Sequence, residues 1–222
     1  PLLWHRLRRT QLEASYTEEA LLLSERAKAL AAMSDAELQA RLDQSRGYAA
    51  SRQLSSSRAR LCDALAALCE ASTRQLGQTP YAVQIMAALA MLDGFVVQVA
   101  PGEGKTLTLG LVAVIRGWEP GPCHVITANE YLAARDAEFL QPLYMLCRLE
   151  AVSLHSEMSP EEKSVAYAKP IVYATAKQVI ADHLIDRVRF GGVVDRIQAS
   201  LRALRGEPPV LLMQRGLQDV LV

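Results

Sequence analysis

The sequence lacks a long apolar run, an excess of charge and paired cysteines. Its longest apolar run, Ile85–Leu92, is far shorter than the ~18 residues that a transmembrane helix needs, so no membrane-spanning helix is predicted. Lys plus Arg and Asp plus Glu both number 24, so the chain carries no basic footprint for nucleic acid. The four cysteines show no C-x-x-C spacing and no His at metal-ligand spacing, which indicates buried thiols in a reducing compartment.

What the sequence does contain is enough apolar material for a packed core. Hydrophobic residues make up 50% of the 222 residues and charged residues 22%, which excludes a disordered chain. The first residue is Pro1 rather than Met, so we expect a piece of a longer protein.

Residues 1–76 have the composition of a helical segment, rich in Leu, Ala, Glu, Arg and Gln. Ser34 and Glu37 form a capping box that begins a helix. Residues 47–57 are rich in Ser and Gly and predict a loop, and Gly77 predicts a helix end. Helices are therefore predicted over residues 17–32, 35–43 and 61–76.

From residue 77 to residue 222 strands and helices alternate, which predicts an α/β fold with a parallel sheet and covering helices. Thr79 followed by Pro80 predicts the start of the first helix. The strands are short apolar runs, as expected when both faces of a sheet are buried. Strands are predicted over residues 95–99, 124–127, 149–154, 171–175, 210–213 and 219–222. Helices are predicted over residues 79–92, 104–116, 130–146, 177–188 and 195–204, and a further helix is predicted to begin at residue 160.

A glycine-rich loop lies between a predicted strand and a predicted helix. Gly102-Glu103-Gly104-Lys105-Thr106 has the ending of a Walker A loop, although Val99 stands where the strict pattern has Gly. Gly102 and Gly104 allow successive backbone amides to turn inward around an anion, at the positive end of a helix. Lys105 is predicted to reach the β- and γ-phosphates, and the Thr106 hydroxyl to bind Mg²⁺.

Gln84 lies 21 residues before Lys105. Its amide offers a donor and an acceptor, which fit the N6 and N7 groups of adenine. An ordinary surface glutamine on a helix is the alternative, and the spacing alone favours that alternative.

Asp182 and Asp186 are four residues apart in a predicted helix. We interpret them as part of a solvated helix face rather than as a pair of metal ligands.

Longer stretches carry a resemblance to a family. Residues 125–138 read Val-Ile-Thr-Ala-Asn-Glu-Tyr-Leu-Ala-Ala-Arg-Asp-Ala-Glu, and Tyr173-Ala174-Thr175 precedes Asp182-His183-Leu184-Ile185-Asp186. With Gln84 and Gly-Glu-Gly-Lys-Thr, these stretches resemble the first nucleotide-binding domain of SecA, the motor ATPase of bacterial preprotein translocation. The resemblance covers about residues 25–188, including Met-Ser-Asp-Ala-Glu-Leu at 33–38.

The resemblance implies a RecA-like, P-loop helicase-type fold over residues 77–222, preceded by the helical segment 1–76. It implies that Gln84, Gly102, Glu103, Gly104, Lys105 and Thr106 bind ATP or ADP, with Mg²⁺ at Thr106. The implied partners of the full-length protein are an unfolded preprotein, a SecYEG-type channel and an anionic lipid surface, and a homodimer is compatible. The implied location is cytoplasmic and peripheral at the bacterial inner membrane. Nucleic acid is not an expected partner.

Some positions depart from the SecA pattern. Ala100-Pro101 replaces Arg-Thr before the loop, and Ala176-Lys177-Gln178 replaces Asn-Asn-Glu, which indicates a divergent member. In the family, a strand like residues 219–222 leads into the Walker B Asp-Glu pair, which we expect just beyond Val222. No catalytic residue is therefore assigned, and this chain alone is expected to bind ATP without hydrolysing it. A nucleic-acid helicase of the same class and a non-enzymatic RecA-like adaptor are the alternatives.

Overall fold

The computed structural model describes residues 2–54, 56–189, 213–214 and 219–222. The chain forms two compact units, residues 1–120 with 139–149, and residues 121–138 with 150–222. We describe each unit by itself, and a domain boundary near residue 76 stays a prediction. The predicted helix at 195–204 and most of the predicted strand at 210–213 lie outside the described residues.

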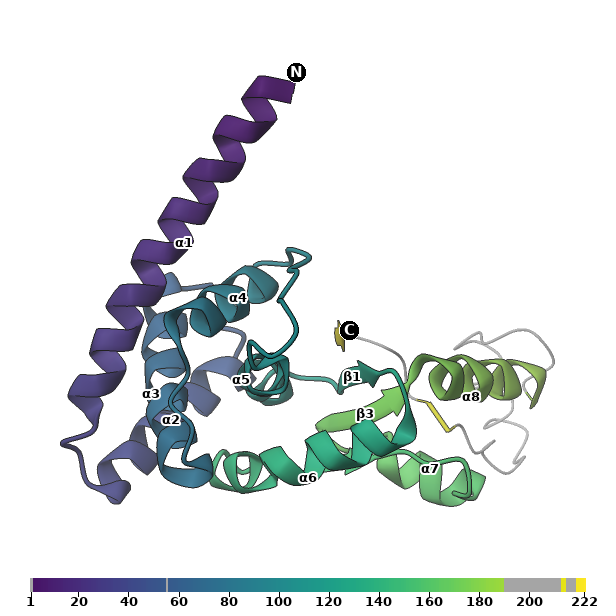
Figure 1. The fold of residues 1–222 in the computed structure, drawn as a ribbon. Coiled ribbons are helices and arrows are strands. Elements are labelled where there is room, and N and C mark those ends of the chain that lie inside the picture. The colour runs from purple at the N-terminus through teal and green to yellow at the C-terminus, as the bar shows by residue number, and fades with distance from the viewer. Residues whose placement is uncertain (1, 55, 190–212, 215–218) are drawn as a thin grey trace. The chain divides into compact units, whose positions relative to one another are not determined.

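The first unit is built from helices (Figure 1). Helix α1 packs against α3 and α4, and α5 packs against α2, α3 and α4. Their shared interior is filled by fully buried apolar side chains such as Leu65, Leu68, Leu89 and Leu111. The helices are α1 (Leu2–Leu30), α2 (Asp35–Ala50), α3 (Arg58–Leu76), α4 (Ala82–Leu92) and α5 (Lys105–Trp118).

Two predicted helix ends are confirmed. Glu37 accepts a hydrogen bond of 2.8 Å from the Ser34 amide, while the Ser34 hydroxyl accepts one of 3.3 Å from the Glu37 amide. Gly77 ends α3 with a φ of +66°. Helix α2, however, continues to Ala50, so the predicted loop at 47–57 begins late. The inward face of α2 extends through Ala49, which is fully buried and favours the longer helix.

Two other predictions in this unit are wrong. Helix α4 begins at Ala82 rather than after Thr79, whose hydroxyl instead accepts a 3.1 Å hydrogen bond from Thr73. Residues 95–99 do not form a strand. A strand requires a neighbour to pair with, and the described residues provide none there. Phe95 is half exposed and Val96 is fully exposed.

The second unit carries a four-stranded sheet in the order β2-β3-β1-β4. All three pairings are parallel, with Cys123 opposite Ile171 and Asp219, and Ala151 opposite Ile171. This sheet and its helices confirm the predicted α/β class. Helix α6 (Glu130–Leu146) begins in this unit, and its residues from 139 on belong to the first unit. The other elements are β1 (Cys123–Thr127), β2 (Ala151–Ser153), α7 (Pro160–Ala166), β3 (Ile171–Thr175), α8 (Ala176–Arg189) and β4 (Asp219–Leu221).

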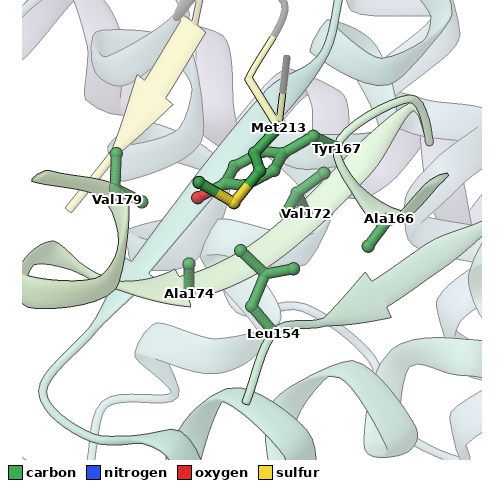
Figure 2. Close-up of a cluster of buried hydrophobic side chains, with 7 residues drawn as sticks. All are labelled: Leu154, Ala166, Tyr167, Val172, Ala174, Val179 and Met213. Atoms are coloured by element: carbon green, nitrogen blue, oxygen red, sulfur yellow. The ribbon is translucent and has the colours of Figure 1, made fainter. Parts of the chain in front are cut away.

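The core of the second unit lies on one face of this sheet (Figure 2). Val172 and Ala174 point to this face because alternate residues of a strand share a side. Val179 of α8 and Tyr167, which follows α7, cover them together with Met213. Ile171 and Tyr173 are also buried, so β3 is enclosed on both faces as its apolar run predicts.

The interpretation of Asp182 and Asp186 as a solvated face is wrong, because both are nearly fully buried. Asp182 accepts hydrogen bonds from Lys163 at 2.7 Å and from Tyr167 at 3.0 Å. Asp186 accepts from the backbone amides of Met213 and Gln214 at 3.1 and 2.8 Å. These partners replace water, which is what allows the two carboxylates to be buried.

Candidate nucleotide-binding site

The glycine-rich loop meets the first turn of α5. Gly102 and Gly104 have φ angles of +85° and +75°, in the left-handed region that favours glycine. Gly104 is the N-cap of α5 and has no side chain to accept from the first-turn amides, and that turn holds no acidic residue. The positive end of the helix dipole is therefore left for an external anion.

Glu103 closes the loop on itself. Its amide donates to the Ala100 carbonyl at 3.3 Å, and its carboxylate accepts from the Ala100 amide at 3.2 Å. Both bonds are local, so they define the turn without covering the start of α5.

Gln84 reaches the loop from α4. Its Nε2 donates to the Glu103 carbonyl at 2.9 Å, and its Oε1 accepts from the Tyr81 amide at 2.9 Å. A Cβ added to Gly104 would lie 2.0 Å from Nε2, so any other residue there would displace the Gln84 amide. The Gln84 side chain is nearly fully buried, which contradicts the interpretation as a surface glutamine. The structure thus brings Gln84 to the loop, and reading adenine stays a prediction.

Lys105 and Thr106 are the first two residues of α5. Lys105 is exposed, and within the described part of the chain its ammonium forms no ion pair. Thr106 is half-buried. Over the same residues no group of three His, Cys, Asp or Glu could hold a metal ion. Binding of Mg²⁺ at the Thr106 hydroxyl therefore stays a prediction.

The sequence analysis missed two side-chain hydrogen bonds made by α5, the helix that begins at the loop. Thr108 is buried, and its hydroxyl donates a hydrogen bond of 3.4 Å to the carbonyl of Gly104. Arg116, in the last turn of α5, donates to the Leu92 carbonyl of α4 at 2.8 Å. A threonine four residues after the last loop glycine was the available signal for Thr108. No sequence signal paired Arg116 with Leu92.

Comparisons with known proteins identify the family of the chain. Residues 5–218 match the family model described as the SecA DEAD-like domain. The chain belongs to the SecA family. It is 40% identical over 188 residues to protein translocase subunit SecA 2 of Chlorobium chlorochromatii, covering 85% of this chain and 28% of that protein. It is 38% identical over 141 residues to protein translocase subunit SecA of Alcanivorax borkumensis, covering 64% of this chain and 15% of that protein.

Membership in the SecA family confirms the predicted RecA-like fold class. The chain spans about a quarter of the length of the first two relatives, 28% and 24%. In the described residues no helix combines the length and the apolar composition needed to cross a membrane.

Proposed function

We propose that this chain is the ATP-binding portion of a SecA-type motor that drives protein translocation across the bacterial inner membrane. The observation that carries the proposal is the loop Gly102–Thr106 at an uncapped helix start, held by Gln84. Two left-handed glycines, an exposed lysine and a positive helix end are the parts that bind a phosphate chain.

Each residue of the loop has a role in this proposal. Gly102 and Gly104 let the backbone amides approach the phosphates, and the Lys105 ammonium neutralises the β- and γ-phosphate charge. The Thr106 hydroxyl would help to hold a Mg²⁺, which would offset the negative charge of the phosphates. Gln84 would offer its second N–H and its remaining lone pair to adenine.

The full-length protein would couple this ATP site to an unfolded preprotein, a SecYEG-type channel and an anionic lipid surface. It would work at the cytoplasmic side of the inner membrane, as a peripheral protein. Support comes from relatives named protein translocase subunits. The zero net charge argues against nucleic acid as the moved substrate.

Titration of the chain with a fluorescent ADP analogue and Mg²⁺ tests the ATP-binding proposal. We expect saturable binding that Lys105→Ala weakens by about a hundredfold, because a desolvated lysine–phosphate contact is lost. Lys177→Ala is the matched control, since Lys177 is likewise an exposed lysine in the first turn of a helix, α8, and is not part of the glycine-rich loop. Equal binding by the two variants, or no binding by the unmodified chain, contradicts the proposal.

A further inference from the structure

The C-terminal end of α4 is held by three other helices of the first unit. The Asp93 carboxylate accepts a hydrogen bond of 2.6 Å from Tyr16 of α1, and bonds of 2.8 Å from Arg58 of α3. The neighbouring Leu92 carbonyl accepts from Arg116 of α5. Asp93 is also the C-cap of α4, so these bonds converge where the chain leaves that helix.

Helix α1 also binds Arg58, the arginine that pairs with Asp93. Arg58 forms a two-pronged ion pair with Glu19 of α1, with both N···O distances at 2.7 Å. The Arg58 guanidinium lies 5.6 Å above the Tyr16 ring, and that ring packs edge-on against Phe95 at 6.2 Å. Burial and the hydrogen bond to Asp93 raise the pKa of Tyr16 to about 12, so its hydroxyl stays a donor. We call Tyr16, Glu19, Arg58 and Asp93 the α1 latch.

The element that the latch holds also carries the nucleotide loop. Helix α4 contacts the loop near its N-terminal end, where Gln84 donates to the Glu103 carbonyl. At its other end the chain passes from Asp93 into residues 95–100, which lead directly into the loop, and the Phe95 amide donates to the Ala90 carbonyl at 2.9 Å. A shift of α4 therefore acts on the loop from two sides.

We propose that Tyr16 and Arg58 are positioning residues for nucleotide binding, through which α1 sets the affinity of the phosphate loop. The inference rests on the proposed nucleotide binding. A loop held in its binding geometry loses less conformational freedom when the phosphates bind, so an intact latch raises affinity. By linkage, bound nucleotide also stabilises the contact of α1 with Asp93.

The chain offers a matched control for this inference. Arg26 of α1 pairs with Asp63 of α3 at 2.5 Å, so it joins the same two helices. Among the described residues neither side chain forms a hydrogen bond or ion pair with α4, so Arg26→Ala removes an α1–α3 ion pair and leaves the bonds to Asp93 in place. Tyr16→Phe removes only the hydroxyl and keeps the ring against Phe95.

The experiment measures the Kd of a fluorescent ADP analogue with Mg²⁺ for the chain and for three variants. We expect Arg58→Ala to raise the Kd about tenfold and Tyr16→Phe about threefold, from the loss of charge-assisted hydrogen bonds. Arg26→Ala should leave the Kd within about twofold, the range of a surface ion pair. Hydrogen exchange at residues 95–104 should accelerate in Arg58→Ala and in Tyr16→Phe but not in Arg26→Ala, and ADP should slow exchange in α1 of the unmodified chain.

The outcomes separate the inference from the proposed function. If the unmodified chain binds no ADP, the proposed function fails and the coupling falls with it. If it binds ADP and Arg58→Ala behaves like Arg26→Ala, the ATP site stands and the positioning role is wrong. Should Arg58→Ala unfold, Tyr16→Phe decides alone, since an unchanged Kd and unchanged exchange at residues 95–104 overturn the inference.

Discussion

The side-chain amide of Gln84 donates a 2.9 Å hydrogen bond to the main-chain carbonyl of Glu103. This bond joins α4 to the centre of the glycine-rich loop. Because an amide has two N–H groups and two lone pairs, the bond to Glu103 and the bond from Tyr81 leave one of each unused. One side chain can therefore hold the loop and contact a base at the same time.

Replacement of Gln84 separates these two roles. Gln84→Ala should weaken ADP binding about tenfold or more, and should reduce the preference for ADP over GDP because the contact with adenine is lost. Competition titrations with both nucleotides measure the ratio. Gln98→Ala is the control, since Gln98 is an exposed glutamine in the segment before the loop. An unchanged ADP-to-GDP ratio would show that Gln84 holds the loop and does not read the base.

Alanine substitutions at Gly104 and Gly102 distinguish the effect of a close contact with Gln84 from the effect of backbone strain. Both have positive φ, so alanine costs about 1–2 kcal/mol at either position. Only at Gly104 would the new Cβ meet Gln84, at 2.0 Å. We expect Gly104→Ala to abolish ADP binding and Gly102→Ala to weaken it less. In the Gln84→Ala background the two substitutions should become equal, and a persisting difference would exclude the Gln84 contact as the cause.

The sequence predicted the loop well because its chemistry is local. Two glycines and a helix start are set by neighbouring residues, as are the capping boxes at Ser34 and Ser159, both of which form. The burial of Gln84 could not be predicted from spacing, since it depends on how α4 packs against the loop. The α1 latch had no sequence signal either, because Tyr16 and Asp93 are 77 residues apart.

Replacing Gly110 by alanine should destabilise the protein, although Gly110 lies inside a helix. Alanine gains about 1 kcal/mol in helix propensity over glycine, yet its Cβ would lie 2.8 Å from both Leu140 methyl carbons. Leu140 is fully buried, so we expect Gly110→Ala to lower the free energy of unfolding by about 1–2 kcal/mol. Urea unfolding measures the change. In a Leu140→Ala background the same substitution should instead stabilise the protein, and destabilisation there would contradict the packing explanation.

The second unit should lose stability as the pH falls below about 6.5, the usual pKa of histidine. Burial lowers the pKa of His124, although a backbone hydrogen bond and the charge of Asp219 oppose the shift. Its Nδ1 has no hydrogen-bond partner in the described residues. The unfolded chain therefore takes up a proton that the folded chain refuses, which costs at most about 1.4 kcal/mol per pH unit.

Thermal unfolding at pH 7.5 and 5.5 measures this dependence. In the His124→Gln variant the unfolding temperature should differ less between pH 7.5 and pH 5.5 than in the unmodified chain. His183→Gln is an exposed control on α8 and should keep the difference of the unmodified chain. Carboxylates with lowered pKa, such as Glu37 and Glu162, titrate below this window because their usual value is 4.5. A difference that persists in His124→Gln would assign the acid sensitivity to another group.

Two of the errors in the sequence analysis, at residues 95–99 and at Asp182, have one physical cause, which is partners distant in the sequence. Residues 95–99 have the apolar composition of a strand, but a strand exists only where a neighbour pairs with it. Asp182 has the charge of a surface residue and is buried because Lys163 and Tyr167 bind it. Composition indicates which secondary structure and which degree of burial a segment favours. The structure that it adopts also depends on the residues that pack against it.

The central claim is that Gly102–Thr106 binds the phosphates of a nucleotide while Gln84 contacts its base. The most direct test is an ¹⁵N NMR titration of the chain with ADP and Mg²⁺. We predict that the backbone amides of Gly102, Gly104, Lys105 and Thr106 shift together with the side-chain NH₂ of Gln84, and that Lys105→Ala largely removes these shifts. Saturable shifts confined to other parts of the chain, or no shifts at all, would contradict the claim.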